Sequence, residues 1–175
     1  GPFHLPAIAF AGRRPHRGQV SARGDETLPA PKVERRLSAI MIADVAGYTR
    51  LVATDEEGAV RELARRQHEV IEPAIRARGG RIVKTSGDGF LADFADSVSA
   101  VSAALQIQSA IAACNEPLES HRRIELRIGI HTADVIVADG DIVGDGVNIA
   151  ARLERLAEPG GVYVSGRVHD EAAHR

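Results

Sequence analysis

Two aspartates occupy positions from which they could hold a metal ion. Asp88 lies in the run Gly87-Asp88-Gly89, between two segments rich in β-forming residues, and Asp44 directly follows an apolar run. Converging carboxylates suit Mg²⁺, a hard cation that takes oxygen ligands and shares its coordination sphere with substrate phosphates. Two such ions about 3.5–4 Å apart would clamp an in-line phosphoryl displacement. The alternative is structural: Asp-Gly between strands is a strong hairpin signal, and Asp44 could cap the turn that follows it.

Asn148 and Arg152 form a second candidate pair, in a segment with helical periodicity. They are four residues apart, so they share one face of a helix. An arginine beside an amide could contact a phosphate and a sugar. The alternative is a solvated arginine that forms a salt bridge with Glu154 or Glu158.

Apolar segments of strand and helix periodicity must position these polar residues. The run 38–43 predicts a buried strand. Thr54 and Glu57 have capping-box spacing and begin a predicted helix that Gly79-Gly80 ends, and Pro73 is expected to kink or shorten it. The other predicted elements are a hairpin over 81–95, a helix over 98–112, one strand or two over 124–137, a helix over 147–157, a short strand over 162–164 and a last helix that opens near Ser165.

This order, β-α-β-β-α-β followed by an extra helix and strand, predicts an α+β fold. It is the ferredoxin-like, split βαβ order, with a palm-type antiparallel sheet. The helices are expected on one face, which leaves the other face free for a partner or a substrate. We also expect the strands before and after the first helix to lie side by side, so that Asp44 and the Asp88 turn meet at one edge.

Composition excludes several classes of function. The chain has 175 residues and a net charge of −2, so nothing indicates a broad electrostatic contact with nucleic acid or an anionic membrane. Cys114 is the single cysteine, which excludes an intrachain disulfide and fits a reducing, cytoplasmic compartment. No apolar run approaches the length of a membrane span. Residues 1–32 hold five of the eight prolines and predict a disordered tail or linker, with the folded domain over residues 33–175.

Four blocks of the sequence together resemble the class III adenylate/guanylate cyclase catalytic domain. They follow the family's order and spacing, and the resemblance covers residues 35 to about 170. Each block is weak alone, but the four together are specific. In chain order the blocks are Asp44-Val45-Ala46-Gly47-Tyr48-Thr49-Arg50-Leu51, Lys84-Thr85-Ser86-Gly87-Asp88-Gly89-Phe90, Leu126-Arg127-Ile128-Gly129-Ile130-His131 and Gly144-Asp145-Gly146-Val147-Asn148-Ile149-Ala150-Ala151-Arg152-Leu153-Glu154.

The resemblance implies a role for each matching residue in the conversion of ATP to 3′,5′-cyclic AMP and pyrophosphate. Asp44 and Asp88 match the ligands of two Mg²⁺ or Mn²⁺ ions, together with the Val45 carbonyl. Phosphate contacts match Arg127 and the amides around Ala46 to Thr49, which include Gly47 and Tyr48. Lys84 and Asp141 match the base-selecting lysine and acid, with Asp139 as a competitor for the acid. Asn148 and Arg152 match the pair that orients the ribose and stabilises the transition state.

Hydrogen-bonding groups on the base favour ATP over GTP. Adenine offers an N1 acceptor and an N6 donor, which a lysine donor and an aspartate acceptor fit. Guanine offers the reverse pattern, and unpaired polar groups in a closed pocket discriminate strongly. Lys84 and Asp88 are four residues apart, roughly 13 Å along an extended strand, so one chain is awkwardly placed to serve both ends of a nucleotide. The resemblance implies a homodimer with sites between the protomers.

Some features depart from the family pattern. The chain has no match to the terminal hairpin that supplies a further phosphate-binding lysine, and Val143 stands where a bulky aromatic is common. A diguanylate cyclase is disfavoured, because its Gly-Gly-Asp-Glu-Phe signature would stand where this chain has Ser86-Gly87-Asp88-Gly89-Phe90. The remaining alternatives are a guanylate cyclase and a catalytically weak or inactive dimerisation or nucleotide-sensing module. A regulatory domain outside this chain is also expected.

Overall fold

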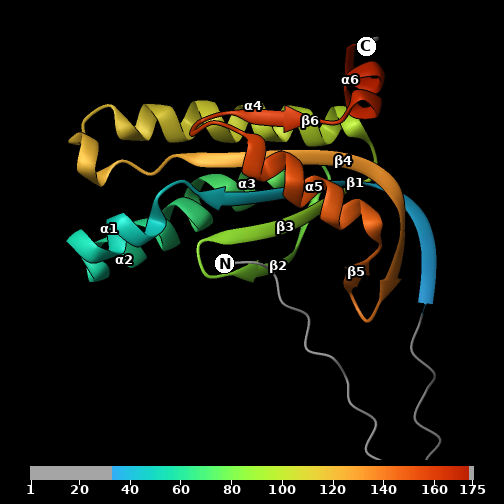
Figure 1. The fold of residues 1–175 in the computed structure, drawn as a ribbon, viewed down its shortest axis with the longest axis horizontal. Helices are drawn as coiled ribbons and strands as arrows, with labels where there is room; N and C mark the ends of the chain where they lie inside the picture. The colour runs from blue at the N-terminus through green and yellow to red at the C-terminus, as the bar shows by residue number, and fades with distance from the viewer. Residues whose placement is uncertain (1–32, 174–175) are drawn as a thin grey trace, which may run out of the picture. The chain divides into compact units, whose positions relative to one another are not determined.

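The computed structural model describes residues 33–173, so the tail predicted over residues 1–32 lies outside the described residues. Figure 1 shows how the elements are arranged. In chain order they are β1 (Val33–Val45), α1 (Tyr48–Thr54), α2 (Glu56–Arg66), η1 (Gln67–Ile71), α3 (Glu72–Ala77), β2 (Arg81–Ser86), β3 (Gly89–Phe94), α4 (Ser97–Asn115), η2 (Ser120–Arg122), β4 (Leu126–Ala138), β5 (Asp141–Val143), α5 (Asp145–Leu156), β6 (Val162–Val164) and α6 (Gly166–Ala173).

The strands form one sheet in the order β2-β3-β1-β4-β5, and β6 pairs with β4. Neighbours along the main path are antiparallel, whereas β6 is parallel to β4. The four strands β2-β3-β1-β4 reproduce the ferredoxin-like order, which confirms the predicted fold class. One detail of the prediction was wrong: β2 is not beside β1, because β3 lies between them. The second strand of the hairpin turns back into the sheet and takes the central position.

The two long strands β1 and β4 form the backbone of this sheet. They pair along their whole length, from Val33 opposite Ala138 to Val45 opposite Leu126. Both bend together at the end where β1 begins (Figure 1). The predicted strand over 38–43 is therefore only the buried middle of β1, which continues through the exposed polar residues 34–36 because β4 supplies their backbone partners.

Alternate residues of β1 contact two separate cores. Ala39, Met41 and Ala43 belong to the larger core, together with buried residues of α3 and α4. Ile40 and Ile42 belong to a smaller core on the opposite face, with Ala150 of α5. Figure 1 shows α5 crossing in front of the sheet and α3 behind it. The face that was predicted to be free is thus partly covered by the extra helix.

The helix predicted to start at Thr54 begins instead after Asp55, whose side chain accepts a hydrogen bond from the Gly58 amide at 2.9 Å. Thr54 ends α1, where its hydroxyl donates to the Arg50 carbonyl at 3.0 Å. Pro73 does not end the helical segment, which runs without a break from α2 through η1 to α3. It stands at the start of α3, just after the π-helical turn η1. A π-turn displaces the hydrogen-bonding register by one residue, which accommodates a residue without an N–H.

Helix α4 has the length and composition of a membrane span, and it is the one such helix among residues 33–173. In this structure Ala100, Ala103 and Ile107 of α4 have no exposed surface and belong to the larger core. That packing is also the arrangement of a core helix of a globular domain, which passes the same test of length and hydropathy.

Candidate functional site

Asp44 and the Asp88 turn lie at the same end of the sheet, as predicted, although by a different route. The route is the β1–β3 pairing, in which Ala43 stands opposite Phe90. A Cβ built on Gly89 would lie 3.6 Å from the Cβ of Asp44 and 2.8 Å from the Ala43 carbonyl oxygen. Glycine at this position therefore permits the turn to approach the end of β1, and only Gly87 of the turn has a positive φ, of 57°.

Arg127 holds the Asp44 carboxylate in a two-armed contact. The two residues are cross-strand partners at the end of the β1–β4 ladder. Arg127 Nε donates to Asp44 Oδ1 at 2.9 Å, and Arg127 Nη2 donates to Oδ2 at 2.6 Å. This hydrogen bonding raises the pKa of Arg127, and the charges of Asp44, Glu154 and Asp88 add to the effect against partial desolvation. The predicted phosphate-binding arginine thus lies beside the predicted metal ligands.

Glu154 is a member of this cluster that the sequence analysis missed. It was considered only as a surface partner for Arg152, but it is 5% exposed, and its Oε1 lies 3.3 Å from Arg127 Nε. Burial, with the Asp44 carboxylate beside it, raises the pKa of Glu154 to about 8. Gly129 accounts for the burial, because a Cβ there would lie 2.3 Å from both the Ala150 carbonyl oxygen and the Glu154 amide nitrogen. The helix therefore lies directly on β4.

The donors at this end of the sheet suit a hard divalent cation. They comprise the carboxylates of Asp44 and Asp88 and the main chain at Val45, all oxygen atoms. Within residues 33–173 no group of three or more His, Cys, Asp or Glu side chains could hold a metal. Such an incomplete set fits Mg²⁺, which takes one or two carboxylates and completes its coordination with water and substrate phosphates.

The segment predicted to contact phosphate begins the short helix α1. Gly47 adopts a left-handed conformation, with φ of 67°, and Tyr48 and Thr49 form the first turn. The amide of Ala46 is not available to a ligand, because it donates to the Glu125 carbonyl at 2.8 Å. The first amides of a helix have no acceptor within the helix, so the residues from Gly47 to Thr49 supply the donors that remain.

Lys84 and Asp141, the predicted base-selecting pair, are in direct contact. Lys84 Nζ lies 3.0 Å from Asp141 Oδ1 and 3.2 Å from Oδ2. Partial burial alone would raise the pKa of Asp141, but hydrogen bonds from Lys84 and the Ile142 amide, and the charges of Lys84 and Arg81, outweigh it and lower that pKa. A donor and an acceptor are thus presented side by side, each half-exposed.

Strand β5 explains why Asp141 rather than Asp139 contacts Lys84. This three-residue strand was not predicted. Asp139 and Gly140 form the turn that precedes it, with φ of 49° and 84°, the pair of positive values that a tight Asp-Gly hairpin requires. Asp139 is therefore a turn residue, and Asp141 is the first residue of the strand that faces β2.

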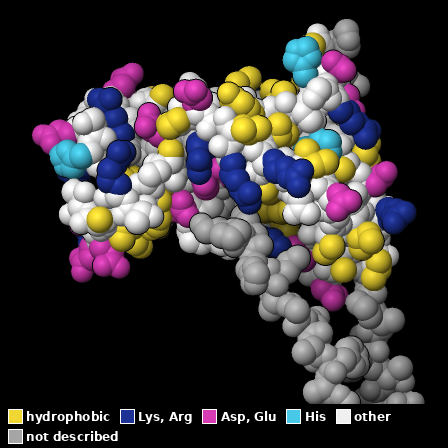
Figure 2. All heavy atoms as spheres, in the orientation of Figure 1, with side chains coloured by type: hydrophobic (Ala, Val, Ile, Leu, Met, Phe, Trp, Pro, Cys, Tyr) yellow, Lys and Arg dark blue, Asp and Glu magenta, His cyan; other side chains and the backbone are white. Residues whose placement is uncertain are grey.

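Asn148 and Arg152 lie on the exposed side of α5. Arg152 forms no ion pair within the described part of the chain, so the predicted alternative of a salt bridge to Glu154 or Glu158 is wrong. Ile149 and Leu156, 38% and 67% exposed, lie on the same helix. Figure 2 shows basic side chains in a row across the face of the molecule on which α5 lies. This surface can receive an anionic group or another chain.

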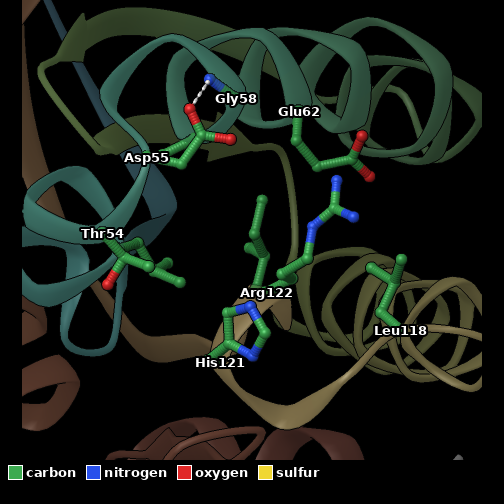
Figure 3. Close-up of a pocket in the computed structure, with 10 residues that line it drawn as sticks. Thr54, Asp55, Gly58, Glu62, Leu118, His121 and Arg122 are labelled. Atoms are coloured by element: carbon green, nitrogen blue, oxygen red, sulfur yellow. Dashed lines mark hydrogen bonds between the residues drawn. The ribbon is translucent and has the colours of Figure 1, made fainter.

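A cavity of about 400 Å³ lies elsewhere. It is formed between α2 and the connection from α4 to β4, where Arg122 extends toward Glu62 (Figure 3). No predicted site residue lines it. A smaller hollow of about 240 Å³ includes Tyr48 and Asp88. Of the predicted site residues, Tyr48, Gly47's neighbour in α1, and Asp88 of the β2–β3 turn therefore face one hollow.

Comparison of the sequence with known proteins identifies a matching family profile and several relatives. Residues 33–173 match the family profile described as "Adenylate and Guanylate cyclase catalytic domain". A putative adenylate cyclase 3 of Rhizobium meliloti is 46% identical over 138 residues, which are 79% of this chain and 24% of that protein. An adenylate cyclase of Streptomyces coelicolor is 35% identical over 147 residues, 84% of this chain and 36% of that protein. The chain therefore spans about a quarter to a third of these relatives.

Solved structures agree with the sequence relatives. The crystal structure of an adenylate/guanylate cyclase/hydrolase from Silicibacter pomeroyi has a TM-score of 0.78 and 46% identity, covering 82% of this chain and 84% of that one. The adenylyl cyclase CyaB from P. aeruginosa has a TM-score of 0.75 over 82% of this chain and 83% of that one, at 23% identity, and therefore supports the fold alone.

Proposed function

The chain belongs to the family of adenylate and guanylate cyclase catalytic domains, and on that basis we propose that it converts ATP to 3′,5′-cyclic AMP and pyrophosphate. The observation that carries the choice of ATP is the contact of Lys84 Nζ with both carboxylate oxygens of Asp141, at 3.0 and 3.2 Å. This pair offers one donor and one acceptor, which match adenine N1 and the N6 amino group. Guanine would face both groups with the wrong partner.

The other end of the sheet provides the phosphate and metal half of the proposed site. Asp44, Asp88 and the Val45 carbonyl would hold two Mg²⁺ or Mn²⁺ ions. When bound, the ions would lower the pKa of the ribose 3′-hydroxyl and neutralise charge on the triphosphate. Arg127, which bonds Asp44 and lies 3.3 Å from Glu154 in the metal-free structure, would contact a substrate phosphate.

The exposed face of α5 would orient the ribose and the α-phosphate for the reaction. Asn148 would hold the ribose so that its 3′ oxygen is in line with the α-phosphorus. Arg152 would offset charge that develops on the phosphoryl oxygens. No side chain of the proposed site is placed as a general base, so we assign proton removal to water or substrate.

A homodimer would bring these halves together. Arg127 and Asp141 are associated with opposite ends of β4, since Arg127 lies at its start and Asp141 pairs with its last residue. One protomer would supply Asp44, Asp88 and Arg127, and its partner would supply Lys84, Asp141, Asn148 and Arg152. Two equivalent sites follow from two-fold symmetry.

Mass detection of the product is the direct experiment. The purified chain is incubated with ATP or GTP in the presence of Mg²⁺ or Mn²⁺, with Asp44→Ala as the control. Cyclic AMP that depends on Asp44 supports the proposal. Cyclic GMP instead would contradict the assignment of Lys84 and Asp141, and no product under any condition would favour a dimerisation or nucleotide-sensing module.

Mixing two inactive variants tests the shared site. Asp44→Ala damages one half of each site and Arg152→Ala the other half, so a mixed dimer contains one intact site. If subunits mix statistically, about a quarter of the wild-type activity returns. Activity that stays absent after subunit exchange, verified by mass spectrometry of the mixed dimer, would contradict sites built from two chains.

A further inference from the structure

Arg81 connects the two edges of the sheet. It is the first residue of β2, and its Nε lies 2.9 Å from Oδ1 of Asp93, its cross-strand partner in β3. Its Nη1 donates a hydrogen bond of 2.9 Å to the Gly140 carbonyl in the β4–β5 turn. Because β2 and β5 end the strand order on opposite sides, this bond crosses between the edges and is not part of a ladder.

A β-bulge places Arg81 and Lys84 so that both reach this hairpin. Residues three apart in a regular strand point to opposite faces of the sheet. The pairing of β2 with β3 shifts between Ile82 and Lys84, and a bulge re-aims the side chains that follow it. As a result, Arg81 contacts Gly140 while Lys84 contacts the adjacent residue, Asp141.

The anchor of Arg81 is rigid. The side chain of Asp93 is 2% exposed, so its carboxylate is fixed by the surrounding sheet. A guanidinium is planar, and its two arms cannot move independently. The Gly140 carbonyl is therefore linked through the Arg81 guanidinium to a buried carboxylate of β3.

We infer that Arg81 is a positioning residue for base selection, because it holds the hairpin at the distance from β2 that lets Asp141 stand beside Lys84. This inference rests on the proposed function, since it concerns the pair assigned to adenine. Without the bond to Gly140, the Asp141 carboxylate is held only by Lys84 and by the amide of its neighbour Ile142, so the hairpin is free to move away from β2 when a base approaches.

Arg36 provides a matched control. It forms an ion pair with Oδ2 of the same buried Asp93 from β1, and no bond joins it to Gly140 or Asp141 among the described residues. If Arg81 only balanced the charge of Asp93, the same substitution at Arg36 and Arg81 would have the same consequences. If Arg81 positions the hairpin, only its substitution changes base discrimination.

The experiment compares Arg81→Lys with Arg36→Lys. Lysine keeps the charge beside Asp93 but lacks a second arm for Gly140. We expect Arg81→Lys to lower the ratio of kcat/KM for ATP to that for GTP by about fivefold, through a higher KM for ATP. Arg36→Lys leaves this ratio unchanged. Amides of residues 138–143 exchange hydrogen faster in Arg81→Lys than in Arg36→Lys, measured by mass spectrometry in the absence of nucleotide.

Equal changes in both variants, or exchange in Arg81→Lys at the wild-type rate, would overturn the inference. Faster exchange without a change in the ATP to GTP ratio of an active enzyme would overturn the link to base selection. If the wild type makes no cyclic nucleotide, the proposed function fails, and hydrogen exchange alone decides whether Arg81 holds the hairpin.

Discussion

The two polar ends of this sheet differ in how their charges are satisfied. At one end, Asp44 and the buried Glu154 share a single cation, Arg127, and the pKa of Glu154 is raised to about 8. At the other end, Lys84 and Asp141 satisfy each other, and the pKa of Asp141 is lowered. One end crowds two carboxyl groups around one cation, and the other end holds a neutral ion pair.

This difference teaches what each end can receive. Burial and the Asp44 charge favour the protonated form of Glu154, so a divalent cation placed beside these groups would favour release of that proton and offset the added negative charge. A neutral, half-exposed pair has no such need, and it suits a neutral hydrogen-bonding group such as the edge of a base. In the proposed dimer, each domain would supply the half that receives the charged part of one nucleotide and the half that receives the base of the other.

Removing the charge of Asp44 gives the largest expected effect. Asp44→Asn is expected to lower the rate of cyclic AMP formation by at least about 10³-fold, because a metal ligand is lost. The free energy of unfolding should change by less than about 1 kcal/mol, because Glu154 remains as a partner for Arg127. Product assays and urea unfolding measure the two quantities, with the exposed Asp134→Asn as the control. If stability and activity fall together, the cluster is structural.

Removing the donor at the other end should alter substrate preference instead. Lys84→Met is expected to lower kcat/KM for ATP by about 10- to 100-fold and to change that for GTP far less. Steady-state kinetics with both nucleotides check this expectation, and the exposed Arg61→Met serves as the control for loss of a surface charge. An equal loss with both substrates would show that Lys84 does not read the base.

The raised pKa of Glu154 predicts a pH dependence of stability in the metal-free protein. A folded-state pKa of about 8, above the ordinary 4.5, means that the folded chain binds the proton more tightly. This contribution to stability is complete below pH 4.5 and is lost as the pH rises through 8. Glu154→Gln should therefore gain about 3–4 kcal/mol relative to the wild type between pH 5 and pH 8.

Urea unfolding in EDTA at both pH values measures that gain. The exposed Glu158→Gln, just beyond the end of the same helix, is the matched control and should follow the wild type. A constant difference between Glu154→Gln and the wild type across this pH range would contradict the crowded arrangement at the Asp44 end.

The smallest expected effect concerns the stability of the neutral pair. Asp141 is 51% exposed and Lys84 37% exposed, so solvent screens their attraction. A double-mutant cycle with Lys84→Met and Asp141→Asn should give a coupling energy below about 1 kcal/mol. Thermal or urea unfolding of the four proteins provides it. A coupling of several kcal/mol would mean that this end also supports the fold.

Much of the fold could be predicted from apolar spacing. The longer strands and the helices are apolar at the spacing typical of each kind of element. The order of these elements along the chain then indicates the ferredoxin-like topology. Strand β5 could not be predicted in this way, because three residues between the Asp139-Gly140 turn and the start of α5 show no period. Strand β5 is recognised only by its pairing with residues 136–138 of β4, which requires the folded sheet.

The sequence predicted the residues of the candidate site better than the residues that hold them in place. Asp44, Lys84 and Arg152 stand in motifs, and the structure brings Lys84 to Asp141 and Arg127 to Asp44. Glu154 was missed because a glutamate on a polar helix face resembles a solvated residue. The signal was present at Gly129, a glycine between apolar strand residues, which commonly marks close approach of another backbone.

That glycine has a thermal consequence. Helix α5 contacts β4 at Gly129 through backbone atoms. The position of the helix on the sheet therefore does not depend on the rotamers of long side chains. Rotamer populations change on warming, whereas covalent backbone dimensions do not. The separation between Glu154 of α5 and Asp44 at the end of β1, which lie in the same chain, should therefore be the dimension of this cluster that heating alters least, up to the temperature at which the sheet itself unfolds.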